Sequence, residues 1–259
     1  MPDWLNVILL GIIEGITEFI PISSTGHLLI AERWLTRQSD LFNVVIQSGA
    51  VLAVIPLFRA RFEQFFHRWR EPATRDLLLK IVAAFAITSV TVLAFEKRLK
   101  LPEELIPVGW ALLVGGIVFL LVELLTSDAK RNEEITWSIA VAVGLAQFVA
   151  AIFPGASRSG TTIMLALLLG LRRSRATEFS FLVGIPTMIA AGGYKVLKEV
   201  RHPHAVPENW GMVLLGTVVA AAVSFVAVKW LLRYVQTHSF TGFGIYRIVL
   251  GLLILAWLH

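Results

Sequence analysis

The sequence predicts an all-α integral membrane protein, built as a single polytopic domain over residues 1–259. Two observations predict this fold class. Hydrophobic residues make up 56% of the chain and the mean hydropathy is +0.75, whereas soluble domains are typically about 45–50% apolar. Apolar segments also recur along the chain at about the length a helix needs to cross the hydrocarbon core, roughly 20 residues. The chain has no cysteine, which excludes disulfide bonds and thiolate metal sites.

The charge of the chain fits a membrane setting better than a nucleic-acid partner. The formal net charge is +5, and in so apolar a chain it indicates basic loops beside anionic membrane lipid. We therefore expect no nucleic-acid binding. The first residues, MPDWLNVILLG, hold no Lys or Arg before the apolar run, so we expect no cleaved signal peptide.

Two apolar stretches are interrupted, and the others are continuous. Residues 4–34 are interrupted by PISSTGH (21–27), and residues 135–170 by PGASRSGTT (154–162). Each half is too short to span a membrane, so we predict two re-entrant helix–loop–helix hairpins, the first with its second helix over 27–36. Non-helical backbone at that depth must be buried in protein or face a wet cavity. Six transmembrane helices are predicted from the continuous segments: 41–58, 77–95, 106–125, 178–197, 210–232 and 243–258.

The order of these elements predicts an inverted-topology repeat, with halves over 1–126 and 135–259 separated by a spacer at 126–136. Each half is a hairpin followed by three spans. Glu14, Pro21 and Ser24 align at one constant offset with Gln147, Pro154 and Ser157. In such repeats the functional site lies near the midplane, where the two breaks meet.

The loops predict the orientation of the chain. With six crossings both termini lie on one side, and the strongly basic loop 59–80 lies on the other. By the positive-inside rule the side of this loop is cytoplasmic. The termini and the first hairpin therefore face the outer side, and the second hairpin enters from the cytoplasm.

Glu14 and Glu18 are the first candidate site residues. They are four residues apart and share one helix face. A charge near the bilayer centre costs about 2.5–3.5 kcal/mol on insertion scales, so something must offset it. A divalent cation, Mg²⁺ or Ca²⁺, bridging the two carboxylates would do so. The alternatives are protonation or pairing with Arg158.

The hydroxyl cluster before His27 suggests nucleophilic chemistry. His27 lies three residues after Ser24, a spacing that suits a general base beside a hydroxyl nucleophile. Ser23 and Thr25 are expected to bind the substrate. The alternative for the two serines is that they only cap the following helix. Both roles are compatible, because a helix N-terminus also binds anions.

The second break has the groups that bind phosphate. Arg158 offers a planar fork of donors, and Gly155 and Gly160 let the backbone approach a ligand. The alternative is that Arg158 pairs with a glutamate only to hold the hairpins together. The other candidate phosphate ligands are hydroxyl groups, those of Ser157, Ser159, Thr161 and Thr162.

The two breaks resemble the signature motifs of a known family. EGITEFIPISSTGH (14–27) and PGASRSGTT (154–162) closely resemble those of the undecaprenyl-diphosphate phosphatase family, the bacitracin-resistance type. FNVVIQSGAVLAV (42–54), TEFSFLVGIP (177–186) and IYRIVLG (245–251) are similar too. The resemblance implies hydrolysis of a polyprenyl diphosphate lipid, undecaprenyl diphosphate, to undecaprenyl phosphate and phosphate at the outer face of the bacterial inner membrane. It also implies carrier-lipid recycling for peptidoglycan synthesis, bacitracin resistance and dependence on a divalent metal.

The resemblance also assigns residues. It places the acidic motif at Glu14 and Glu18, the Ser–His pair at Ser24 and His27, and the diphosphate cradle at Arg158. The cradle is completed by Ser157, Ser159 and Thr162. One departure is Asn43, where many members have an acidic residue.

We therefore expect a divalent cation held by Glu18 and Glu14 to bind the diphosphate, and Arg158 with the second hairpin to hold the transferred phosphoryl group. Ser24, activated by His27, then attacks the terminal phosphorus. Direct attack by water, with Ser24 only a ligand, stays open. The alternative function is a lipid transporter or flippase that uses the same midplane site. The oligomeric state, including a homodimer, also stays open.

Overall fold

The computed structural model describes residues 1–99, 103–126, 132–202 and 208–257. Within these residues the regular structure is helical, apart from an isolated bridge between Asn132 and Leu171. Five helical segments of the described residues are long and apolar enough to cross a membrane, and one of them is the continuous segment Asp40–His67. The predicted all-α class is thus confirmed, with the helix lengths and composition of a membrane protein.

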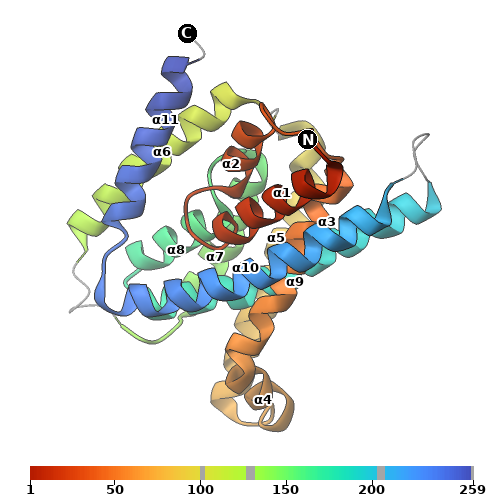
Figure 1. Ribbon diagram of the computed structural model, residues 1–259. Helices are drawn as coiled ribbons and strands as arrows, with labels where there is room; N and C mark the ends of the chain where they lie inside the picture. The colour runs from red at the N-terminus through yellow and green to blue at the C-terminus, as the bar shows by residue number, and fades with distance from the viewer. Residues whose placement is uncertain (100–102, 127–131, 203–207, 258–259) are drawn as a thin grey trace.

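The two halves of the chain present the same order of elements (Figure 1). Each begins with two helices of 16 residues or fewer and continues with three further helical segments, the first of which is Asp40–His67 in the first half. The first half contains α1 (Asp3–Thr17), α2 (Ser24–Ala31), α3 (Asp40–Val54), the 3₁₀ helix η1 (Ile55–Phe58), α4 (Arg59–His67), α5 (Pro72–Leu99) and α6 (Leu105–Leu125). The second half contains α7 (Trp137–Ile152), α8 (Arg158–Leu168), α9 (Arg173–Arg201), α10 (Trp210–Thr237) and α11 (Thr241–Trp257).

The predicted spans coincide with helices. The segments 41–58, 77–95, 106–125, 178–197 and 210–232 fall on α3 with η1, α5, α6, α9 and α10. The segment 243–258 falls on α11, which is apolar but only 17 residues long, and residue 258 lies outside the described residues. The predicted spacer at 126–136 also lies partly outside them, at 127–131.

Each short helix pair packs against a long helix of the other half. Helix α1 lies along α10, and α7 lies along α5. Helix α3 contacts α9, and α6 pairs with α11 at one edge of the molecule (Figure 1). This reciprocal packing brings the α1–α2 loop close to the α7–α8 loop, although they are far apart in the sequence.

The same small-residue contact holds both hairpins in place. An added Cβ at Gly15 of α1 would lie 2.7 Å from a backbone oxygen of α10, and one at Gly144 of α7 would lie 2.8 Å from a backbone oxygen of α5. Ser224 Oγ donates to the carbonyl of Gly15 at 3.0 Å, and Thr88 Oγ1 donates to that of Gly144 at 2.9 Å. Close approach at small residues with a side-chain hydrogen bond is typical of helix packing inside membranes.

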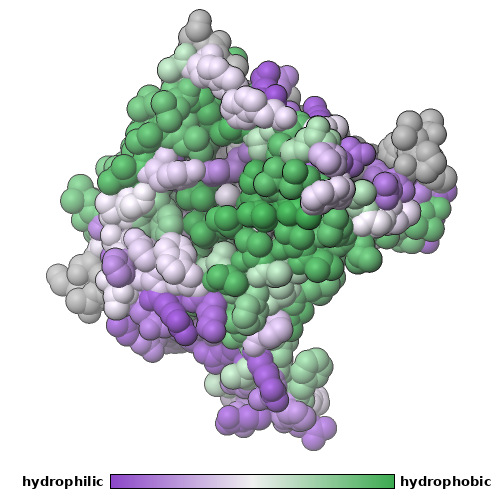
Figure 2. Space-filling model, viewed as in Figure 1, coloured by the Kyte–Doolittle hydropathy of each residue, from purple (hydrophilic) through white to green (hydrophobic). Residues whose placement is uncertain are grey.

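The outward faces of the long helices are apolar. Figure 2 shows a broad hydrophobic surface across the middle of the molecule, with hydrophilic residues gathered below it and on α4. Exposed residues on these faces include Leu93, Leu124, Leu214, Val226 and Leu253. So large an apolar surface suits contact with membrane lipid rather than water.

The basic residues of α4 and α9 meet at one end of the molecule. Arg61 Nε donates to Glu178 Oε1 at 2.5 Å, and Arg175 Nη1 donates to Glu178 Oε2 at 2.6 Å. Glu178 therefore joins α4 to the start of α9. The segment 59–80, predicted as a loop, is helical in α4 and the first turns of α5, and it shares one end of the molecule with the start of α9.

Candidate active site

Two serines with the same unusual backbone begin the second helix of each hairpin. Ser23 has φ 75° and Ser157 has φ 68°, in the left-handed region that non-glycine residues seldom adopt. Each is the N-cap of its helix: Ser23 Oγ accepts from Gly26 N at 3.3 Å, and Ser157 Oγ accepts from Gly160 N at 3.2 Å. Such strain costs on the order of 1–3 kcal/mol and clusters at functional sites.

The structure corrects the predicted length of both breaks. Helix α2 begins at Ser24 and not at residue 27, and α8 begins at Arg158 within the predicted break 154–162. The reason is the serine cap, which satisfies an N–H of the first turn and lets the helix start directly after the strained residue. The conformational counterpart of Ser157 is therefore Ser23, and not Ser24 as the sequence alignment predicted.

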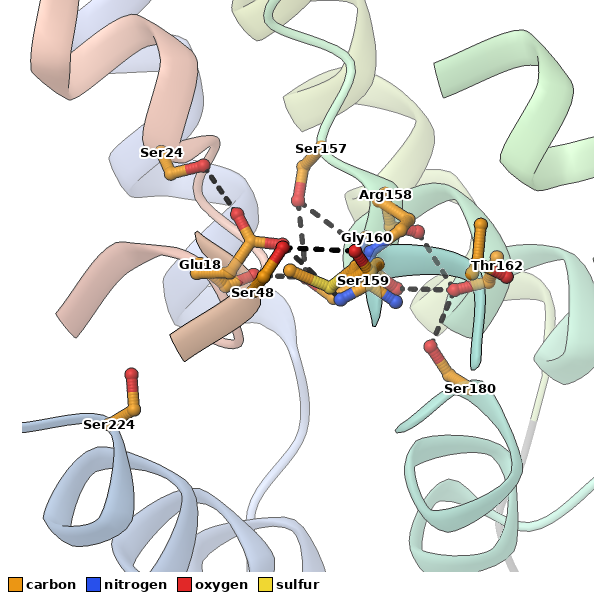
Figure 3. Close-up of polar contacts among 12 residues, drawn as sticks. Glu18, Ser24, Ser48, Ser157, Arg158, Ser159, Gly160, Thr162, Ser180 and Ser224 are labelled. Carbon is orange, nitrogen blue, oxygen red and sulfur yellow. Dashed lines mark hydrogen bonds and ion pairs between the residues drawn. The ribbon is translucent and has the colours of Figure 1, made fainter. Parts of the chain in front are cut away.

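Glu18 joins the two hairpins (Figure 3). Ser24 Oγ donates to Glu18 Oε2 at 2.7 Å, and Arg158 Nη2 donates to Glu18 Oε1 at 3.3 Å. Ser159 Oγ also donates to the backbone oxygen of Glu18, at 3.5 Å. The carboxylate is buried at the C-terminal end of α1. The hydroxyl of Ser24 from the first half and the guanidinium of Arg158 from the second thus both bind the carboxylate of Glu18.

Two nitrogens of the Arg158 guanidinium make no hydrogen bond to the described residues. They are Nε and Nη1, and both are buried. A positive charge in the first turn of α8 is also unfavourable to the helix dipole. An anionic ligand at the same N-terminus would offset both costs, because it accepts from the guanidinium and from free backbone N–H groups.

The guanidinium of Arg158 lies against bare backbone of α9. An added Cβ at Gly184 would lie only 1.9 Å from Arg158 Nη1. Gly184 therefore provides the space that lets Arg158 reach Glu18.

Glu14 fits a divalent cation. It is fully buried, and neither carboxylate oxygen has a hydrogen-bond partner in the part of the chain that the structure describes. Glu18 lies one helical turn away, since its N–H donates to Glu14 O at 2.9 Å. Clusters of three or more His, Asp or Glu are absent among the described residues, so the chain offers two carboxylates. This suits Mg²⁺, which is commonly bound by one or two carboxylates together with substrate phosphates.

His27 is engaged elsewhere than at Ser24. Its Nδ1 lies 2.7 Å from the carbonyl oxygen of Ser23, and its Nε2 lies 2.6 Å from Tyr246 Oη. A carbonyl only accepts, so Nδ1 carries a proton, and in the neutral ring Nε2 accepts from the tyrosine hydroxyl. The hydroxyl of Ser24 donates to Glu18 instead. The structure therefore brings Ser24 together with Glu18 and does not form the predicted Ser24–His27 hydrogen bond.

The remaining hydroxyl groups divide into two sets. Ser157 Oγ and Ser159 Oγ lie 3.3 Å apart at the start of α8, close to Arg158. The two threonines make bonds inside the protein: Thr161 Oγ1 donates to Ser157 O at 2.7 Å, and Thr162 Oγ1 lies 2.6 Å from Ser180 Oγ. Thr161 and Thr162 thus stabilise the turn that carries Arg158, while Thr25 is half-buried in the first turn of α2.

Comparison with known proteins agrees with these motifs. The model of one family, described as "Bacitracin resistance protein BacA", matches residues 7–253 of this chain. The chain belongs to the BacA family. The motifs 14–27 and 154–162 lie inside the matched residues, and the predicted family resemblance is confirmed. Its family and its apolar helices make this BacA-family chain a multi-pass membrane protein.

Relatives of this BacA-family chain are similar over almost the whole length. A protein of Rhizobium leguminosarum bv. trifolii (strain WSM2304) is 51% identical over 98% of this chain and 96% of its own length. A protein of Xanthomonas oryzae pv. oryzae (strain PXO99A) is 50% identical over 100% of this chain and 98% of its own. Both are named undecaprenyl-diphosphatase.

Three residues of this BacA-family site were missing from the sequence prediction. Gly184 makes room for Arg158, Tyr246 bonds His27, and Arg247 contacts both hairpin loops. The sequence holds a signal for the last of these, because an arginine inside an apolar segment is rare and usually functional. The roles of Gly184 and Tyr246 depend on tertiary contacts alone.

Proposed function

We propose that this protein hydrolyses undecaprenyl diphosphate to undecaprenyl phosphate and inorganic phosphate. The observation that carries the proposal is Glu18, whose carboxylate contacts Ser24 of one hairpin and Arg158 of the other. The name of the relatives, which share half of their residues with this chain, supports the same substrate. In the cell this activity would recycle the carrier lipid for peptidoglycan synthesis and confer resistance to bacitracin.

We propose a role for each group, supported by these contacts. Glu18 Oε2 takes the proton of Ser24 as Ser24 Oγ bonds to the terminal phosphorus, and the bond from that phosphorus to the bridging oxygen breaks. Undecaprenyl phosphate leaves, and water then releases phosphate from the phosphoserine. Arg158 and the N–H groups that begin α2 and α8 stabilise the transferred phosphoryl group. This mechanism places Glu18 in the role of base that the sequence predicted for His27.

A divalent cation, Mg²⁺ or Ca²⁺, is part of the proposal. Glu14 and Glu18 would hold it, and when bound it would neutralise phosphate charge. The support is the pair of unpartnered carboxylate oxygens on Glu14. Activity that disappears with a chelator and returns with added metal is the expected result.

Direct attack by water is the alternative chemistry, with Ser24 only a ligand. Rapid acid quench of the enzyme with substrate labelled in the terminal phosphate distinguishes the two. We expect a phosphoserine at Ser24. A Ser24→Ala variant that keeps near-normal turnover would rule out nucleophilic attack by this residue.

We further propose six membrane crossings, re-entrant hairpins, both termini on the outer side of the bacterial inner membrane, and a site open to that side. The support is the reciprocal packing of the hairpins and the basic end formed by α4 and α9. Because the chain lacks cysteine, single cysteines report the side directly. Exposed Trp34→Cys should react with an impermeant thiol reagent in intact cells, whereas exposed Phe66→Cys should react only after permeabilisation.

A lipid transporter or flippase is the second candidate, favoured by the matching order of elements in the two halves. An assay of purified protein in detergent distinguishes hydrolysis from transport, because phosphate release does not require a membrane with two sides. We expect release from undecaprenyl diphosphate, and its absence at every metal concentration would leave transport as the better account. The mass of the same sample tests whether the protein is a homodimer.

A further inference from the structure

Arg247 of α11 is one of the largest side chains that the fold buries completely, with an exposed fraction of 0%. A charge in such a place is costly unless its donors are satisfied. Among the described residues the hydrogen bonds of its guanidinium go to backbone carbonyl oxygens, Nε has no partner, and Phe119 lies 5.3 Å away in a cation–π contact. Arg247 therefore holds main chain rather than a carboxylate.

The carbonyls that Arg247 holds belong to both hairpin loops. Nη1 donates to Pro21 O at 3.4 Å in the first loop. Nη2 lies 3.2 Å from Gly155 O and 3.0 Å from Ala156 O in the second loop, and 3.2 Å from Ala111 O of α6. Pro21 and Gly155 each lie two residues before the strained capping serine of their loop. One side chain thus contacts the same point of both halves.

The surrounding helix leaves room for this guanidinium and little else. An added Cβ at Gly115 of α6 would lie 2.1 Å from Arg247 Nη2. The planar guanidinium of arginine presents donors in two directions. A lysine side chain cannot reproduce this, because its donors all sit on one nitrogen. The contact therefore requires an arginine at 247 and a glycine at 115.

We propose that Arg247 is a positioning residue that sets the separation of the two loops. The proposal rests on the proposed function, because that separation places Ser24 and Arg158 on the two oxygens of Glu18. Arg247 holds the backbone behind the site, so its effect on catalysis passes through the loops. A catalytic group misplaced by about 1 Å costs on the order of 100-fold in rate. We expect a loss of this scale when the hydrogen bonds of Arg247 to the loops are weakened.

The first test compares Arg247→Lys with Arg173→Lys. Arg173 is a matched control, because its guanidinium binds Glu123 Oε1 at 3.0 Å and Oε2 at 2.5 Å, and both side chains are largely buried. We expect Arg247→Lys to lower kcat about 100-fold with KM within a few-fold, and Arg173→Lys to lower Tm with kcat nearly unchanged. Equal losses of kcat in the two variants would overturn the proposal.

The second test reads the loops without activity. The cysteine-free chain allows spin labels at two exposed positions beside the loops, Ile16→Cys on α1 and Phe153→Cys after α7. We expect one narrow distance distribution that broadens or shifts in Arg247→Lys and not in Arg173→Lys. An unchanged distribution in Arg247→Lys would overturn the proposal.

A third variant covers a failure of Arg247→Lys to fold. Gly115→Ala keeps the arginine and pushes its guanidinium, whereas Gly193→Ala meets no atom within 4 Å and is the control. Only Gly115→Ala should broaden the distance distribution. If the labels respond as expected while the wild-type protein releases no phosphate, the positioning role stands and the proposed function fails.

Discussion

The two hairpins share one backbone and carry opposite charges. Ser23 and Ser157 have nearly the same positive φ, and each caps its helix by accepting from the glycine three residues on. The first hairpin brings Glu14 and Glu18 to this turn, whereas the second brings Arg158. The backbone thus provides a helix N-terminus for an anion twice. The side chains differ, with Ser24 and the two carboxylates on the first hairpin and the guanidinium of Arg158 on the second.

Removing the charge geometry of the second hairpin should have the largest effect. Arg158→Lys keeps a positive charge but loses the fork, so we expect kcat for phosphate release to fall about 10²–10³-fold. Arg175→Lys is the control, since Arg175 pairs with Glu178 in the first turns of α9 and not with Glu18. Full activity of Arg158→Lys would show that the second hairpin needs only a charge.

The next largest effect is expected from filling the space on α9 beside Arg158. Gly184→Ala puts a Cβ 1.9 Å from Arg158 Nη1, and the forced shift should lower kcat by up to about 100-fold. Gly193→Ala lies on the same helix in open space and should leave kcat unchanged. Steady-state kinetics of the two variants check this. Equal activities would mean that the guanidinium has other room to move.

Removing each serine cap in turn tests whether the two turns have equivalent backbone structures. Ser23→Ala and Ser157→Ala each lose one hydrogen bond to an N–H, so each should cost about 1–2 kcal/mol of stability. Thermal unfolding in detergent measures both. Very unequal shifts in Tm would contradict the claim that the two serine-capped turns are structurally equivalent.

The smallest effect is expected at Tyr246. Tyr246→Phe removes the hydroxyl 2.6 Å from His27 Nε2, a hydrogen bond worth about 1 kcal/mol, so kcat/KM should fall about fivefold. A loss as large as that of Arg158→Lys would return His27 to the role of base. Turnover within error of the wild type would make the contact structural only.

The places of the hairpins were predictable because polar residues inside an apolar stretch must be buried together. Glu18, Ser24 and Arg158 do meet, as the motifs 14–27 and 154–162 predicted. The partner of Ser24 was not predictable. With α2 beginning at Ser24, the ring of His27 turns to the carbonyl of Ser23, and that start depends on a strained serine which the sequence does not reveal.

Contacts between distant segments were equally hidden. Arg247 lies more than ninety residues from Gly155, and its target is a backbone carbonyl, which has no sequence signature. The spacing of the apolar residues places α11 in the fold, but only the packing of α11 on α6 shows which way the guanidinium points.

The central claim is that the two hairpins form a single site, and a double-mutant cycle tests it most directly. Phosphate release from undecaprenyl diphosphate would be measured for Glu18→Gln, Arg158→Gln and the double variant. Residues that act as one unit give non-additive losses, so the double variant should be about as slow as the slower single variant. Losses that multiply would show that Glu18 and Arg158 act independently, and would contradict a shared site.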